Sequence, residues 1–63
     1  MTQKELLYLE DAIGHETNLI NIISSTISLL EDKNLISFMR KHLKKHQNLK
    51  QKLMQTMEDV INE

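Results

Sequence analysis

Aliphatic residues recur along residues 6–30 at alternating spacings of three and four positions. This spacing is the a/d repeat of a helix that packs along one seam, so it predicts a long amphipathic helix. One position of the repeat carries a carboxylate instead of an aliphatic side chain. We call this set the first seam, and its members are Leu6, Leu9, Ile13, Glu16, Ile20, Ile23, Ile27 and Leu30.

A second set of positions in the same segment follows the same spacing on another face, about 110° around the helix. A helix that has two such faces has two helical neighbours, which is the situation in a four-helix bundle rather than in a simple two-stranded coil. We call this set the second seam, and its members are Tyr8, Ala12, His15, Leu19, Ile22, Thr26 and Leu29.

The ends of this helix, and a second helix after it, are also encoded locally. Thr2 and Glu5 form a capping box, so the helix is expected to begin near residue 3. The 3,4 pattern breaks between Leu30 and Leu35, where Asp32 or Asn34 can cap a new helix. We therefore predict a single domain, residues 1–63, with a helix over 3–30, a turn over 31–34 and an antiparallel helix over 35–61. The alternative is one continuous helix of nearly the whole chain, since no proline interrupts it.

The second helix repeats the seam pattern, with histidines in two of its positions. Aligning the helices about the turn places Leu30 opposite Leu35, so Glu16 lies opposite Leu49, with His46 about 4.5 Å and His42 about 10.5 Å along the axis. Both histidines are then expected to face the first helix. The seam consists of Leu35, Met39, His42, Leu49, Leu53 and Val60, with His46 and Thr56 at the two remaining positions.

Three polar residues, Glu16, His42 and His46, thus interrupt apolar seams. A buried carboxylate needs a partner, and three interpretations remain open. The pair can be a polar cluster that fixes the alignment of an otherwise uniform aliphatic bundle. It can be a zinc or iron site, with His15 as a further ligand, because imidazole and carboxylate suit both metals. The third interpretation is an exposed, unengaged histidine pair.

Length and composition favour association of two chains. A chain of 63 residues buries only about 60% of its unfolded surface, and with no cysteine it has no disulfide to compensate. One Phe, one Tyr and no Trp leave an interface of Leu, Ile and Met. The expected fold is therefore an all-α antiparallel two-helix hairpin that forms a homodimeric four-helix bundle. The core and dimer contacts are assigned to Leu9, Ile13, Leu19, Ile20, Ile23, Ile27, Met39, Leu49 and Leu53.

Charge and motifs exclude several classes of function. The formal net charge is −1, and there is no aromatic platform for bases, so nucleic-acid binding is not expected. No run of 18 apolar residues occurs, and charged residues interrupt the amino-terminal region, which predicts a soluble cytoplasmic chain without a membrane segment. With no phosphate-binding loop and no activated nucleophile, the chain is not expected to be an enzyme.

The segments KELLYLEDAIGHE (residues 4–16) and KKHQNLKQKLM (residues 44–54) resemble the small spore-coat proteins of the spore coat protein F type, found in endospore-forming bacteria. YLEDAIGHE is the most specific part of the resemblance, which covers nearly the whole chain. It implies a ferritin-like helical pair and a coat-associated structural component, made in the cytoplasm of a sporulating cell and assembled with other coat proteins.

Ferritin-like proteins hold each iron with a glutamate from one helix and a Glu-x-x-His motif from the next. Under the resemblance Glu16 matches the first glutamate and His46 the histidine, but Leu43 occupies the position of the second glutamate. The resemblance therefore implies the fold more than an oxygen-activating centre. We expect a structural or interaction protein. The alternatives are a ferritin-like metal-binding protein and a helical adaptor that binds a partner helix.

Overall fold

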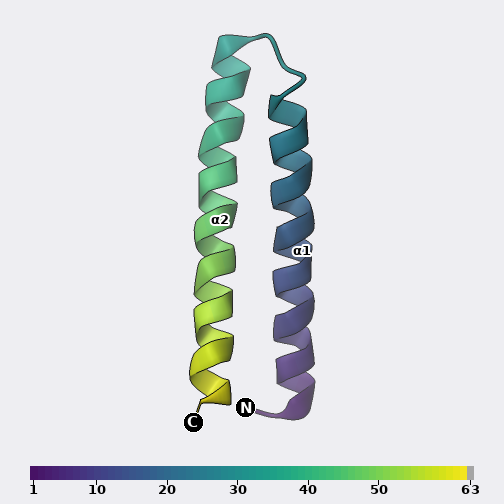
Figure 1. Ribbon diagram of the computed structural model, residues 1–63, viewed down its shortest axis with the longest axis vertical. Helices are drawn as coiled ribbons and strands as arrows, with labels where there is room; N and C mark the ends of the chain where they lie inside the picture. Colours follow the sequence, from purple (N-terminus) through teal and green to yellow (C-terminus); the bar gives the residue numbers. More distant parts are fainter. Residues whose placement is uncertain (63) are drawn as a thin grey trace.

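The computed structural model describes residues 1–62 as two antiparallel helices joined by a short connection (Figure 1). Helix α1 spans Gln3–Ile27 and helix α2 spans Lys33–Ile61. Both chain termini lie at the end of the hairpin away from the connection, which we call the open end (Figure 1). The predicted all-α hairpin is confirmed for these residues.

Helix α1 begins where its capping box places it. The Thr2 hydroxyl accepts from the backbone N–H of Glu5 at 3.1 Å, and the Glu5 carboxylate accepts from the backbone N–H of Thr2 at 2.9 Å. These reciprocal bonds satisfy two backbone donors that the first turn of a helix would otherwise leave without partners. The sequence therefore sets the start of α1 at Gln3.

The connection is shifted toward the amino terminus relative to the predicted turn over 31–34. Helix α1 ends at Ile27, where the Ser28 hydroxyl bonds the Ser25 carbonyl at 2.6 Å. Such hydroxyl bonds compete with the helix backbone and favour an end. Helix α2 then begins at Lys33 rather than residue 35, because the Asp32 carboxylate accepts from the backbone N–H of Leu35 at 2.8 Å.

The residues of α1 that face α2 are those of the first seam, whose last member, Leu30, lies in the connection. All eight of its members are buried or half-buried, and Ile23 is the one apolar residue within residues 1–62 that is less than a tenth exposed. The other residue buried to that degree is Glu16. The hairpin therefore has a single narrow seam in place of a core.

The residues of α2 that are half-buried follow a different heptad set from the predicted one. Apart from His42, which is also half-buried, they follow one another in steps of three and four, and they are Ile36, Met39, Leu43, His46, Lys50, Leu53, Met57 and Val60. We call this set the packed row. Four predicted positions, Met39, His46, Leu53 and Val60, belong to it.

The predicted positions Leu35, Leu49 and Thr56 are instead exposed. Leu35 and Leu49, at 44% and 41% exposure, lie one residue before members of the packed row. A shift of one residue turns a side chain about 100° around a helix, so these leucines lie on a neighbouring face of α2. Lys50 occupies the inward position that a pattern of apolar residues alone assigns to Leu49.

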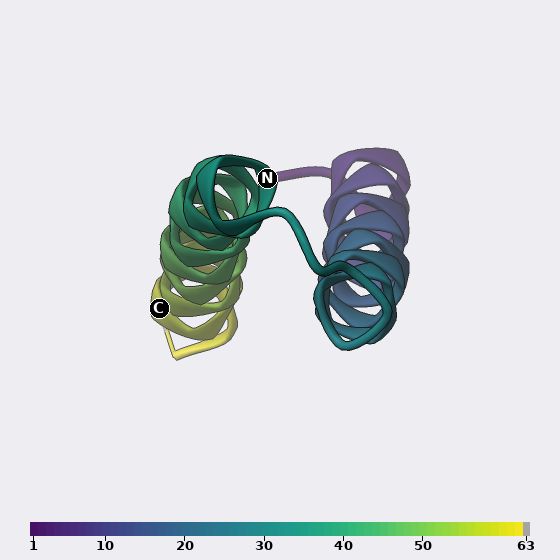
Figure 2. The ribbon, with the colours of Figure 1, turned by 90° about the horizontal axis from the view of Figure 1, so that it is seen from above.

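Seen along the helices, the hairpin is a single layer with nothing from residues 1–62 over either of its two broad faces (Figure 2). Its extents are 46 × 15 × 11 Å. Neither of its two helices is long and apolar enough to cross a membrane. Each helix is thus covered only on the side that faces the other helix, and the rest of its surface is exposed to water.

Candidate functional site

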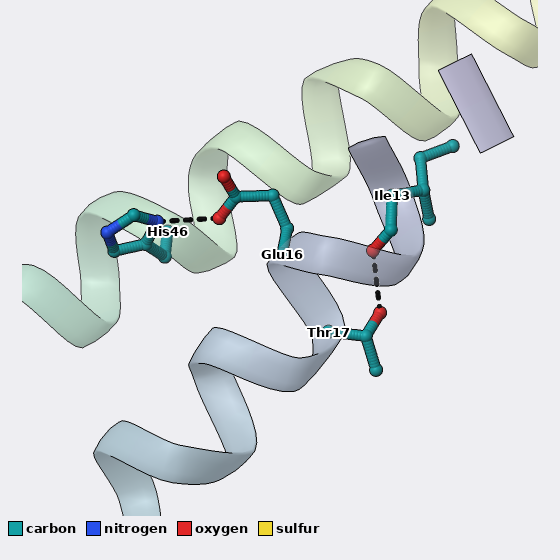
Figure 3. A network of polar contacts seen from close by, with 4 residues as sticks. All are labelled: Ile13, Glu16, Thr17 and His46. Carbon is teal, nitrogen blue, oxygen red and sulfur yellow. Dashed lines mark hydrogen bonds and ion pairs between the residues drawn. The ribbon is translucent and has the colours of Figure 1, made fainter. Parts of the chain in front are cut away.

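The two helices are joined near their middle by a contact between Glu16 and His46. The Glu16 Oε2 atom lies 2.6 Å from the His46 Nδ1 atom, and the two side chains point toward each other between the helices (Figure 3). The Glu16 side chain is 10% exposed and the His46 side chain 25%. An ionised carboxylate can only accept, so it pairs with the His46 tautomer that carries a proton on Nδ1, and the buried carboxylate has the partner that its burial requires.

This contact corrects the predicted alignment of the helices. Glu16 lies level with His46, three residues from the predicted partner Leu49, because α1 ends earlier than expected and the connection is correspondingly shifted. The contact also fixes the height of all other residues. Along antiparallel helices, two residues lie at the same height when their numbers sum to about 62.

The hydroxyl of Thr17, next to Glu16, is satisfied within α1. Its Oγ1 donates to the Ile13 carbonyl at 2.9 Å (Figure 3). Thr17 therefore does not compete with His46 for the carboxylate. Across the middle of the hairpin, the polar groups near the seam form local bonds and a single bond between helices.

The other two histidines are not part of this contact. His42 lies on the exposed neighbouring face of α2, half-buried, with its ring centroid 4.5 Å from that of Phe38. His15 is exposed on the second seam of α1. The predicted inward placement is confirmed for His46 by its contact with Glu16. His42 is half-buried like Leu43 beside it, and its place among the ligands stays a prediction.

Within residues 1–62, no group of three or more His, Cys, Asp or Glu side chains lies close enough to hold a metal ion. One hairpin brings together two of the four predicted ligands, Glu16 and His46, and leaves His42 and His15 apart from them. A structural zinc site uses four protein ligands and a catalytic one three. Binding of zinc or iron stays a prediction.

A second feature of the hairpin is the set of apolar residues on one broad face. In each helix, every member of this set directly precedes an inward residue: Leu19 precedes Ile20, and Leu35 precedes Ile36. A rotation of 180° about an axis perpendicular to the layer superposes one of the two antiparallel helices on the other. This rotation keeps each broad face on its own side, so equivalent heptad positions of α1 and α2 lie on the same broad face. The second seam and its counterpart in α2 therefore form one surface.

We call this surface the second face. From α1 it contains the second seam as far as Thr26, in which Tyr8 and Ile22 are 59% and 61% exposed, and Leu29, at 82% exposure, follows in the connection. From α2 it contains Leu35, Phe38, His42, Leu49 and Thr56, and Phe38 is 57% exposed. The remaining positions of the face in α2 carry charges, and they are Lys45, Lys52 and Asp59. The opposite broad face of α1 is more polar, with residues such as Glu10, Asn21 and Ser24.

Comparison of the chain with protein-family models, with curated proteins and with solved structures finds no match. The likeness to spore coat protein F therefore stays a prediction. The Glu16–His46 contact and the second face are the two features from which a function can be inferred.

Proposed function

We propose that the protein is a structural or interaction protein that works as a homodimer, in which the second faces of two hairpins pack together into a four-helix bundle. The observation that carries this proposal is the contrast between the two sides of α1. Its inward side buries one apolar residue, Ile23, below a tenth exposure, whereas Ile22 beside it is 61% exposed.

The energetics of a small hairpin support association. A two-helix layer of this size buries too little apolar surface to offset the conformational entropy of its own folding, which is why small scaffolds rely on disulfides, metals or oligomerisation. The chain has no cysteine, and its hairpin gathers only two candidate metal ligands. Packing two second faces would bury large aliphatic and aromatic side chains, each worth about 1.5–3 kcal/mol when fully covered.

The Glu16–His46 pair has a specific part in this proposal. Aliphatic side chains at 3,4 spacing tolerate a slip of one helix along the other, because each heptad resembles the next. A slip by one heptad would leave the Glu16 carboxylate buried beside an apolar side chain, at a cost of several kcal/mol. The pair therefore selects one alignment of the seam, and with it the continuity of the second face.

The experiment compares two substitutions in α1. Ile22→Glu places a charge on the second face, whereas Leu7→Glu places the same charge at a 53% exposed position away from it. We expect Ile22→Glu to convert dimers into monomers and to lower the stability, and Leu7→Glu to leave association unchanged. Equal masses for both variants and the unsubstituted protein would refute a dimer through the second face.

The cellular setting we propose follows from the resemblance of residues 4–16 and 44–54 to spore coat protein F. A dimeric bundle made in the cytoplasm of a sporulating cell would join other coat proteins as a structural component. A coat component is expected to be retained in purified spores and extracted with the coat fraction. Loss of the protein from that fraction in washed spores would remove this part of the proposal.

An adaptor is the second candidate, and the same surface favours it. The second face is wide enough to receive an amphipathic partner helix, as in helix-in-groove recognition. The two candidates differ in the free protein. An adaptor is monomeric until its partner is present, whereas the proposed bundle is dimeric when pure.

A further inference from the structure

Charged residues lie along the outer side of the second face, next to its members in α1 and at its own outer positions in α2. In α1 these are Lys4 and Asp11, and in α2 they are Lys52 and Asp59, and all four are exposed. The members of each pair are seven residues apart, so they lie on one side of their helix about 10 Å from each other. The α1 edge of the face therefore carries one positive and one negative position, and the α2 edge carries a negative position, Asp59, after two positive ones, Lys45 and Lys52.

The structure places Lys4 beside the second face directly. Its Nζ atom lies 5.8 Å from the centre of the Tyr8 ring, and Tyr8 belongs to the second seam. Asp59 accepts a hydrogen bond from Gln55 at 2.9 Å, which holds its carboxylate along α2. These residues sit on the far sides of the two helices, so they do not pair within one hairpin.

The heights of these charges match across the two helices. Since Glu16 lies level with His46, residues whose numbers sum to about 62 share a height. Lys4 is thus close to the height of Asp59, and Asp11 is close to the height of Lys52. In both pairs, the two residues at the same height carry opposite charges.

Two hairpins can pack face to face about a twofold axis in two ways. If the axis runs along the helices, both connections lie at the same end, and each α1 lies against the α2 of the partner. If the axis crosses the helices, the connections lie at opposite ends, and like helices meet. Both arrangements bury the same second face, so the charges at its edges decide between them.

The first arrangement brings opposite charges together. Each α1 then lies at equal height beside the partner's α2, so Lys4 faces Asp59 of the partner and Asp11 faces Lys52 of the partner. The twofold axis repeats both pairs, which gives four. The next residue along the α2 edge, Lys45, meets the uncharged Asn18.

The second arrangement brings like charges together. The middle of the second face, between Tyr8 and Leu29, lies near the height of residue 44 of α2. Lys45 would then meet its own copy close to the axis. Asp11 would meet the partner's α1 near Ser25, where no cation lies.

We propose that the two hairpins dock with both connections at the same end, so that each α1 packs against the α2 of the partner. This inference rests on the proposed dimer and adds its topology. The second copy completes the site, because the charges that flank the second face find their partners only across the interface.

A distance between two identical labels tests the topology. The natural chain has no cysteine, so Asn34→Cys, at an exposed position beside the connection, carries one spin label per protomer. With connections at the same end, the two labels lie within about two helix diameters, roughly 20–25 Å. With connections at opposite ends, the separation approaches the hairpin length of 46 Å. The long distance would overturn the proposed topology.

The same labelled samples distinguish a dimer with the other arrangement from the absence of a dimer. A dimer with a long label distance overturns only the arrangement. A monomeric mass with no dipolar coupling overturns the dimer itself. Gln3→Cys at the open end supplies a second site, for which we also expect the short distance.

Charge reversal provides an independent test on the interface. Asp11→Lys removes two attractive pairs and adds two repulsive ones, so we expect the dimer dissociation constant to rise about tenfold. Adding Lys52→Asp in the same chain should restore it. Glu10→Lys is the matched control, because it makes the same change of charge on the opposite broad face. Equal weakening by Asp11→Lys and Glu10→Lys would contradict the pairing.

Discussion

Glu16 and His46 form the one side-chain hydrogen bond between the two helices of residues 1–62, with 2.6 Å between Oε2 and Nδ1. Thirty residues separate them in the sequence. The bond lies in an otherwise aliphatic seam, so removing one partner has a different consequence from removing both. A double-mutant cycle exposes that difference.

We expect His46→Leu alone to lower the free energy of unfolding by about 1–3 kcal/mol, because it leaves the Glu16 carboxylate buried without a partner. The double variant Glu16→Leu, His46→Leu should be at least as stable as the unsubstituted protein, since leucine fits the seam. Urea unfolding at one protein concentration measures both. Gln47→Leu, at the exposed neighbouring position, is the control and should change stability by less than about 0.5 kcal/mol. The pairing would be contradicted if the stability change of the double variant equalled the sum of the changes caused by Glu16→Leu alone and His46→Leu alone.

Gly14 is expected to be a site at which stability can be gained. It lies in the interior of α1, and a Cβ atom added there meets nothing within 4 Å. Since alanine favours a helix more than glycine does, Gly14→Ala should raise the free energy of unfolding by about 0.5–1 kcal/mol. Thermal unfolding measures the change. A loss of stability would indicate that another chain approaches the backbone of α1 at Gly14, on a side away from the second face.

The first turn of α1 should loosen in acid. The pKa of Glu5 lies below its ordinary value, first because its carboxylate accepts a hydrogen bond from the Thr2 backbone and second because of the bond with the Thr2 side chain. A folded-state pKa that is lowered adds stability above the unfolded pKa of about 4.3, and that stability is lost as pH falls through the folded pKa.

Amide exchange of the first turn should therefore quicken between about pH 5 and pH 3, relative to exchange in the middle of α1. Glu5→Gln keeps the capping geometry but cannot titrate, so its first turn should lack this pH dependence. The same acid response in Glu5→Gln would assign the effect to another group.

Zinc is expected to leave stability unchanged. Each hairpin brings together two of the predicted ligands, Glu16 and His46, whereas zinc sites use three or four protein ligands. One equivalent of zinc should therefore not raise the melting temperature of protein purified without a histidine tag. A rise that disappears in Glu16→Ala would favour the metal-binding alternative and place Glu16 among the ligands.

The sequence predicts α1 well because its seam is nearly pure. Seven aliphatic residues keep the 3,4 spacing, and each of them is buried or half-buried in the structure. Thr2 and Asp32 act as caps, as expected. These signals are local, since they depend on side chains within a few residues of one another.

The alignment of α2 is harder to predict because two heptad sets overlap in it and share Met39, His46, Leu53 and Val60. The set that faces α1 passes through Lys50, whose aliphatic stem can lie half-buried while its ammonium group reaches water. Hydropathy alone prefers Leu49 at that point. The choice depends on contacts between the helices, above all the bond from Glu16 to His46.

The mass of the purified protein in solution shows whether two chains associate through the second face. Light scattering over concentrations from about 1 µM to about 1 mM should give twice the chain mass of 7.4 kDa at the upper end. Ile22→Glu should reduce this value to the mass of a single chain. A folded, helical protein that keeps the mass of one chain at every concentration would contradict association through the second face.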